Sequence, residues 1–189
     1  LQDYEVTRDR VIAHAKVLCD ATHIPVSADL ENGFGDAPET CAETIRFAAA
    51  AGLVGGSIED FSSELCEQYS LEQSRERIAA AVDAAKSLPF RFTLTARAEN
   101  FFTGIPDLGD TISRLQAYQE AGAGVLFAPG LQTVEDIRSV LASIDRPLNV
   151  LIGPFKSFIS VADLAELGVR RISLGRIIHF YIRFDLNSL

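Results

Sequence analysis

The feature that most constrains the fold is a pattern that repeats six times along the 189 residues. Each unit has a stretch with apolar residues at helical spacing, followed by a short run rich in branched apolar residues. We expect helices over 5–22, 38–52, 71–87, 108–122, 133–144 and 160–168, and strands over 24–31, 53–60, 91–100, 123–130, 147–154 and 170–175. Strands that alternate with helices are typical of a buried parallel sheet, so the fold class is α/β.

Polar residues recur where these strands end, which favours a closed barrel over an open sheet. The residues at such ends are Asp29 and Glu31, Glu59 and Asp60, Arg97 and Glu99, and Asn149. In a (β/α)8 TIM-type barrel these ends meet at one mouth, where active sites lie. The loop "NGFG" after the first strand does not match the GxGxxG pattern of dinucleotide-binding sheets.

Six strands are too few to close an eight-stranded barrel. We therefore expect residues 1–189 to form a single (β/α) barrel domain that is N-terminally incomplete, with the first strands absent from this chain.

Charge and composition narrow the function. The formal net charge is −9, which argues against nucleic acid or an anionic membrane as a partner and favours small molecules. No apolar run approaches the roughly 18 residues of a membrane span, and the N-terminus does not resemble a signal peptide, so we expect a cytoplasmic protein. The three cysteines have no CxxC spacing, which indicates neither a zinc site nor a disulfide framework.

The acidic residues after the first strand indicate a metal site. Asp29 and Glu31, two positions apart, point to the same side of a strand, and Glu59 approaches from the next strand. Carboxylates in such proximity repel each other unless a cation compensates, and oxygen ligands without His or Cys suit Mg2+ or Mn2+. Gly33 lets the backbone approach a ligand. The alternative is that Asp29 and Glu31 cap a helix or form loop salt bridges.

Four motifs together carry a family resemblance. "PVSADLENGFGD", "AGLVGGSIED", "TLTARAEN" and "AGAGVLFAPG" occur in this order. They resemble the isocitrate lyase/phosphoenolpyruvate mutase superfamily, particularly its phosphonomutase-like branch, from about Asp3 to Gly175. The resemblance implies a (β/α)8 barrel, a Mg2+ ion and chemistry on 2-oxo acids or their enolates.

The resemblance also implies roles for individual residues. Asp29 corresponds to the metal-binding aspartate, and Glu31 and Glu59 to acidic residues that hold the ion mostly through water. Arg97 corresponds to the arginine that grips the substrate carboxylate, for which a guanidinium offers a fixed fork of donors.

Two further positions are assigned in the same way. Asp3 corresponds to an active-site aspartate on the loop after the second strand of the family. Asn149 corresponds to a polar strand-end residue that contacts substrate or water. For Arg97, a structural ion pair with Glu99 or Glu59 stays open as the alternative.

The stretch 61–70, "FSSELCEQYS", departs from the family. Lyases of the isocitrate type carry K-[KR]-C-G-H here. Cys66 lies near the right separation from Glu59, but no lysine precedes it and no Gly-His follows. Phosphonate-cleaving members have Lys and Asn in this loop, and neither is present. These departures argue against a classical isocitrate lyase, methylisocitrate lyase or phosphoenolpyruvate mutase.

We therefore expect an enzyme that uses Mg2+ on a 2-oxo acid or related short dicarboxylate through an enolate, as a C–C lyase, decarboxylase or hydrolase. One alternative is a phosphate-binding barrel isomerase or aldolase that uses the loops at Gly153 and Gly175. Another is a non-catalytic barrel that binds a 2-oxo acid. Family members commonly form tetramers, so we expect a homo-oligomer, either a tetramer or a dimer.

Overall fold

One curled parallel sheet organises the chain. The computed structural model describes residues 7–62, 64–152 and 159–175. Within them, six strands form a parallel sheet in the order β1-β2-β5-β6-β7-β8. These strands are β1 (Ser27–Asp29), β2 (Gly55–Glu59), β5 (Thr93–Arg97), β6 (Val125–Phe127), β7 (Leu148–Leu151) and β8 (Arg171–Ser173). A short antiparallel pair, β3 (Phe61–Ser62) and β4 (Glu67–Gln68), follows β2.

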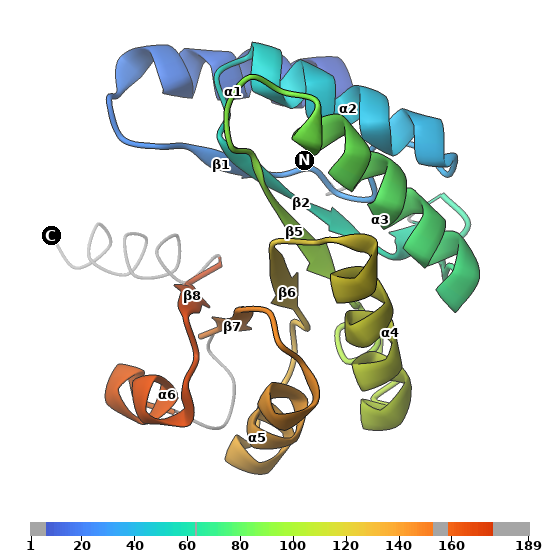
Figure 1. Cartoon of the computed structure of the whole chain (residues 1–189), viewed down its shortest axis with the longest axis vertical. Helices are drawn as coiled ribbons and strands as arrows, with labels where there is room; N and C mark the ends of the chain where they lie inside the picture. The colour runs from blue at the N-terminus through green and yellow to red at the C-terminus, as the bar shows by residue number, and fades with distance from the viewer. Residues whose placement is uncertain (1–6, 63, 153–158, 176–189) are drawn as a thin grey trace, which may run out of the picture.

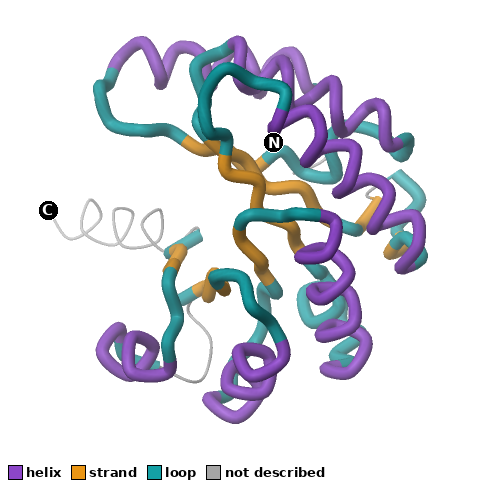
Figure 2. Tube along the Cα trace, viewed as in Figure 1, coloured by secondary structure: helices purple, strands orange, loops and turns teal. Residues whose placement is uncertain are grey.

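The helices cover the outer side of this sheet. They are α1 (Arg8–Ala21), α2 (Pro38–Ala50), α3 (Leu71–Lys86), α4 (Leu108–Ala121), α5 (Val134–Ser143) and α6 (Val161–Leu167). Figure 1 shows the strands curving into a half-barrel with the helices outside it. The inner, concave side of the sheet faces the open part of the half-barrel (Figure 2).

The two faces of each strand differ, as the strand period of two requires. In β5, Leu94 and Ala96 are buried in the core, whereas Thr93, Thr95 and Arg97 line the concave side. The core between sheet and helices includes Ile45, Ile58, Leu94, Leu115, Leu126, Ile137 and Leu148. Burial of each such side chain contributes about 1.5–3 kcal/mol, so this layer is the main source of stability.

Local sequence signals define where several helices begin and end. Ser70, Asp107, Thr133 and Ser160 are N-cap residues, and each side chain accepts a hydrogen bond from the backbone N–H three positions on. Such caps satisfy an N–H that has no partner within the helix. Gly122 ends α4 in the left-handed conformation, with φ of 103°.

The structure confirms the α/β class and the six helix–strand units, with shorter strands than the sequence pattern predicts. The β3–β4 pair was not predicted, because two residues per strand are too few to show a period. No helix in the described ranges is long and apolar enough to cross a membrane. The single, N-terminally incomplete domain stays a prediction.

Candidate active site at the carboxyl ends of the strands

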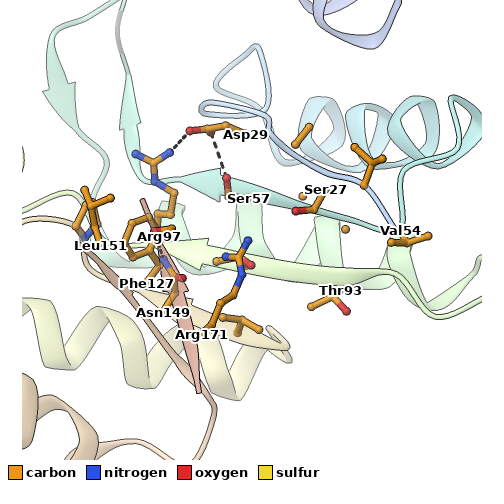
Figure 3. A pocket seen from close by; sticks show the side chains of 18 of the residues that line it. Ser27, Asp29, Val54, Ser57, Thr93, Arg97, Phe127, Asn149, Leu151 and Arg171 are labelled. Atoms are coloured by element: carbon orange, nitrogen blue, oxygen red, sulfur yellow. Dashed lines mark hydrogen bonds and ion pairs between the residues drawn. The ribbon is translucent and has the colours of Figure 1, made fainter. Parts of the chain in front are cut away.

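Arg97 is the centre of the candidate site. It ends β5, and the sheet register places Glu59 directly beside it on β2. Asp29 ends β1, the strand on the other side of β2. The parallel sheet therefore brings together three residues that lie far apart in the sequence, as the strand-end pattern predicts. Figure 3 shows the ion pair between Asp29 and Arg97.

The guanidinium of Arg97 contacts three carboxylates. Nη1 lies 2.6 Å from Oδ2 of Asp29, Nη2 lies 3.1 Å from Oε2 of Glu59, and Nε donates to Oε1 of Glu99 at 2.9 Å. The ring of Phe127 lies beneath the guanidinium, with its centroid 5.5 Å from Cζ. A ring in this position attracts a cation and limits the access of water to it.

Burial differs sharply among these groups. The side chain of Arg97 is 11% exposed, whereas that of Asp29 is 56% exposed. Burial raises the pKa of Glu59 to about 8 and that of Glu99 to about 7, although Arg97 acts in the opposite direction on both. Burial alone would lower the pKa of Arg97, but the three carboxylates raise it. The site thus holds more acidic groups than one arginine neutralises.

The loop after β1 is held in a fixed conformation. Oδ1 of Asp29 accepts hydrogen bonds from the N–H of Glu31 at 3.1 Å and from Oγ of Ser57 at 3.2 Å. Glu31 has a left-handed backbone with φ of 51°, and its carbonyl accepts from the N–H of Glu59 at 2.9 Å. Both strand ends are therefore linked through this loop.

Gly33, predicted to contact the substrate, packs against α2. A Cβ at this position would lie 2.9 Å from Sγ of Cys41, and φ is +82°. Its carbonyl accepts from Oγ1 of Thr44 at 2.8 Å. Close packing and backbone conformation thus explain this glycine, and a substrate contact stays a prediction.

Arg77 of α3 binds the backbone of the loop that follows β1. It is 1% exposed and donates to the carbonyl oxygens of Asn32, Gly35 and Asp36, the second at 2.7 Å. Its guanidinium also lies 4.1 Å from the ring centroid of Tyr69. The buried guanidinium of Arg77 thus fixes the backbone of this loop, which lies close to residues that contact Arg97.

A pocket of about 460 Å3 on the concave side includes part of this site. Asp29 and Arg97 lie on its wall, together with Asn149, which is 1% exposed. Nδ2 of Asn149 donates to Oγ of Ser173 at 3.0 Å, and its buried Oδ1 has no hydrogen-bond partner in the described part of the chain. Such an atom is suited to a bound donor, and the contact of Asn149 with substrate or water stays a prediction.

The carboxylates do not form a direct three-ligand metal site. Within residues 7–62, 64–152 and 159–175, no group of three or more His, Cys, Asp or Glu side chains is arranged to hold a metal ion. Arg97 lies between Asp29 and Glu59 and contacts both. An exposed Asp29 with other carboxylates nearby fits an ion that takes one protein carboxylate and keeps several waters, as Mg2+ does.

Other predicted residues have different outcomes. Asp3 and Gly153 lie outside the described residues. Gly175 is described and has φ of 52°. Cys66 is exposed and lies in the turn that joins β3 to β4, with φ of 54°. This small hairpin occupies the stretch in which lyases carry their catalytic motif.

Comparison with known proteins identifies the family. Residues 1–182 match the phosphoenolpyruvate phosphomutase family model. The chain belongs to the phosphoenolpyruvate mutase/isocitrate lyase superfamily. Oxaloacetate decarboxylase of Rhodopseudomonas palustris (strain BisA53) is 30% identical over 171 residues, which cover 87% of this chain and 57% of that protein. For 2-methylisocitrate lyase of Escherichia coli (strain K12), the identity is 31% over 156 residues, which cover 79% of this chain and 51% of that protein.

Solved structures of the superfamily share the fold. A candidate lyase/mutase from Burkholderia cenocepacia J2315 is 50% identical, with a TM-score of 0.93 over 97% of this chain and 66% of that one. For 2,3-dimethylmalate lyase the TM-score is 0.86 at 24% identity, over 97% of this chain and 65% of that one, a likeness of fold. The chain spans about half to two thirds of the length of the curated relatives it matches.

Sequence reasoning missed part of the site. Glu99 was recognised as a strand-end residue and as an alternative partner of Arg97, but it was given no role in the site. Both alternative ion pairs of Arg97, with Glu59 and with Glu99, are present in the structure. Asp60 is 2% exposed and binds Arg114 and Tyr118 of α4. The only available signal was the adjacency of Asp60 to Glu59 at a strand end, and nothing in the pattern indicated a partner on α4.

Proposed function

We propose that the protein is an enzyme that uses a divalent cation, Mg2+ or Mn2+, to act on a 2-oxo acid or short dicarboxylate, as a carbon–carbon lyase, decarboxylase or hydrolase. The observation that supports this most directly is the placement of Arg97 among Asp29, Glu59 and Glu99 at the strand ends. The names of superfamily relatives, which include oxaloacetate decarboxylase and 2-methylisocitrate lyase, agree with it.

Arg97 binds and orients the carboxylate of the substrate in this proposal. Its planar guanidinium presents parallel donors that match a carboxylate, and Phe127 limits the access of water to it. The exposed Asp29 is the group that a substrate carboxylate displaces most readily, because Glu59 and Glu99 are buried.

Asp29 would hold the cation directly, and Glu31 and Glu59 would hold its water. When bound, such an ion supplies Lewis-acid stabilisation of the negative charge that develops on an enolate oxygen. Asn149 presents its unpartnered Oδ1 to a donor on the substrate or to water. We place Asp3 at the same site from the resemblance, as a residue that orients water or moves a proton.

A screen of 2-oxo and 2-hydroxy acids for release of pyruvate or glyoxylate, with and without Mg2+, tests the proposal. We expect turnover that requires the cation and that Asp29→Ala abolishes while its circular dichroism spectrum stays unchanged. Undiminished activity of Asp29→Ala would contradict the assignment. Binding of oxaloacetate that needs Mg2+ but gives no turnover would instead favour a non-catalytic binding protein.

A further inference from the structure

We propose that Asp60 is a positioning residue through which helix α4 sets the orientation of Arg97. The proposal is built on a continuous set of contacts that runs from Tyr118 and Arg114 to Asp60, then to Glu99, and then to Arg97. Its kinetic consequence rests on the proposed function, whereas the structural link can be tested separately.

Asp60 turns away from the side to which Glu59 points. Adjacent residues at a strand end point to opposite sides, so Glu59 reaches Arg97 while Asp60 enters the space between the sheet and α4. Asp60 is 2% exposed. A carboxylate in such a place is strongly disfavoured unless donors surround it.

Four donors satisfy this carboxylate. Oδ2 accepts from Oη of Tyr118 at 2.6 Å, from Nε2 of Gln68 at 3.0 Å and from Nη1 of Arg114 at 3.1 Å. Oδ1 accepts from the backbone N–H of Glu99 at 2.9 Å. Three side chains therefore fix the carboxylate, and the carboxylate in turn fixes the backbone of Glu99.

Glu99, whose backbone Asp60 fixes, in turn orients the side chain of Arg97. Its carboxylate accepts from Nε of Arg97, which leaves the two terminal nitrogens directed at Asp29 and Glu59. The carbonyl of Glu99 accepts from the N–H of Phe102 at 2.9 Å, so its backbone is bound on both sides. A shift of Glu99 would rotate the guanidinium away from a substrate carboxylate.

The residue after Glu99 is tied to the same set of contacts. Asn100 accepts from Gln68 at 3.2 Å and donates to Asp110 of α4 at 2.7 Å. Asp110 also accepts from Nε of Arg114 at 2.6 Å. Two consecutive residues that follow β5 are thus held by α4, Asn100 directly and Glu99 through Asp60.

Stability alone does not explain a charged cluster in this place. Replacement of buried ion pairs by apolar side chains of similar volume is often neutral or stabilising, so buried charges are weak evidence of a stabilising role. The contacts of Asp60 are directional, and the one to the Glu99 N–H leads straight to Arg97. The geometry fits a role in orientation.

Tyr118→Phe removes one donor to Asp60 and leaves the ring. We expect the amide of Glu99 to exchange with deuterium at least about tenfold faster, and the KM for the oxo acid identified by the screen to rise about tenfold with kcat within about threefold of wild type. A rise in KM alone indicates loss of ground-state and transition-state binding together. A merely structural role would lower the melting temperature and speed the exchange of buried core amides such as that of Leu94 as much as that of Glu99, with KM unchanged.

Tyr69→Phe is the matched control. It removes a buried tyrosine hydroxyl that contacts Asn32 and Asp36 instead of Asp60. We expect it to leave exchange at Glu99 within about twofold of wild type. Should Tyr118→Phe fail to fold, Gln68→Ala removes another donor to Asp60 from a half-buried position, with the same expected direction.

Unchanged exchange at Glu99 in a folded Tyr118→Phe or Gln68→Ala variant would overturn the proposal. So would equally faster exchange in Tyr69→Phe, because the effect would then not depend on loss of a donor to the Asp60 carboxylate. The exchange experiment needs no turnover. A wild-type protein that turns over no oxo acid would therefore contradict the proposed function. The exchange experiment would still show whether α4 is linked to Glu99.

Discussion

Asp29 and Arg97 form an ion pair of 2.6 Å in which one partner is buried and the other is mostly exposed. The pair occupies part of the guanidinium that, in our proposal, receives the carboxylate of the substrate. An incoming carboxylate and Asp29 therefore compete for the same donors. A cation that binds Asp29 would relieve this competition, which couples cation binding to substrate binding.

This competition predicts an unusual effect of Asp29→Asn. Without a divalent cation, we expect the variant to bind oxalate about fivefold more tightly than wild type. The substitution removes the partly exposed ion pair that competes with oxalate, which should make the free energy of oxalate binding more favourable by ~1 kcal/mol. Added Mg2+ should increase oxalate affinity in wild type and have no effect in the variant. Calorimetric titration with oxalate measures both effects.

Asp20→Asn is the control for this titration, since it removes the same charge from the exposed surface of α1, where Asp20 pairs with Lys16. We expect it to bind oxalate like wild type. Equal or weaker cation-free binding by Asp29→Asn would show that Asp29 does not compete for Arg97.

Arg97→Lys tests whether the guanidinium geometry matters beyond charge. An ammonium group cannot contact three carboxylates along fixed directions or present two parallel donors to a substrate carboxylate. We expect kcat/KM to fall by about 10²–10³, which corresponds to about 3–4 kcal/mol. Steady-state kinetics measure this, and Arg138→Lys on the exposed side of α5 should behave like wild type. A loss of less than fivefold would exclude Arg97 as the carboxylate-binding group.

The strand-end rule explains how much of the site could be predicted. Parallel strands converge at one edge, so Asp29, Glu59 and Arg97 could be placed together from spacing alone. The rule gives neither the pairs that form nor the directions in which side chains turn. The metal interpretation of Asp29 and Glu59 therefore did not place Arg97 between them, although an ion pair of Arg97 with Glu59 or Glu99 was kept open as the alternative.

Contacts between distant elements were beyond sequence reasoning. Tyr118 and Arg114 read as ordinary positions on an amphipathic helix, and their distance in sequence from Asp60 gives no hint of contact. Asp60 itself was visible only as the neighbour of Glu59. Such contacts depend on how α4 packs against the sheet, which a hydrophobic period does not specify.

Arg77 offers a test of the loop after β1. Arg77→Met should remove the side-chain donor of the partly buried carbonyls of Gly35 and Asp36, and one of the two donors of the Asn32 carbonyl, which also accepts from the thiol of Cys41. We expect the free energy of unfolding to fall by about 3 kcal/mol or more, because each unmet buried polar group costs about 1–3 kcal/mol. Urea unfolding measures the change. Arg75→Met, at an exposed position of the same helix, should change it by less than about 0.5 kcal/mol; a similar small effect of Arg77→Met would argue against its role in the loop.

Glu99 should make stability depend on pH. Burial raises the pKa of its carboxyl to about 7 in the folded protein, against the opposing effect of Arg97 and with the repulsion of Asp60 and Asp29. The folded state therefore binds more protons than the unfolded state between about pH 4.5 and 7. The stability that this proton contributes is fully present below about pH 4.5 and is lost as the pH rises through 7.

We expect Glu99→Gln to remove this contribution. Between pH 5 and 7, without divalent cations, the free energy of unfolding of wild type should decline more steeply than that of the variant, by up to about 1 kcal/mol per pH unit. Urea unfolding at several pH values gives the two slopes, and Glu120→Gln, at an exposed position of α4, should keep the wild-type slope. Parallel slopes for Glu99→Gln and wild type would mean that Glu99 is already ionised at pH 5, and that Arg97 outweighs the effect of burial.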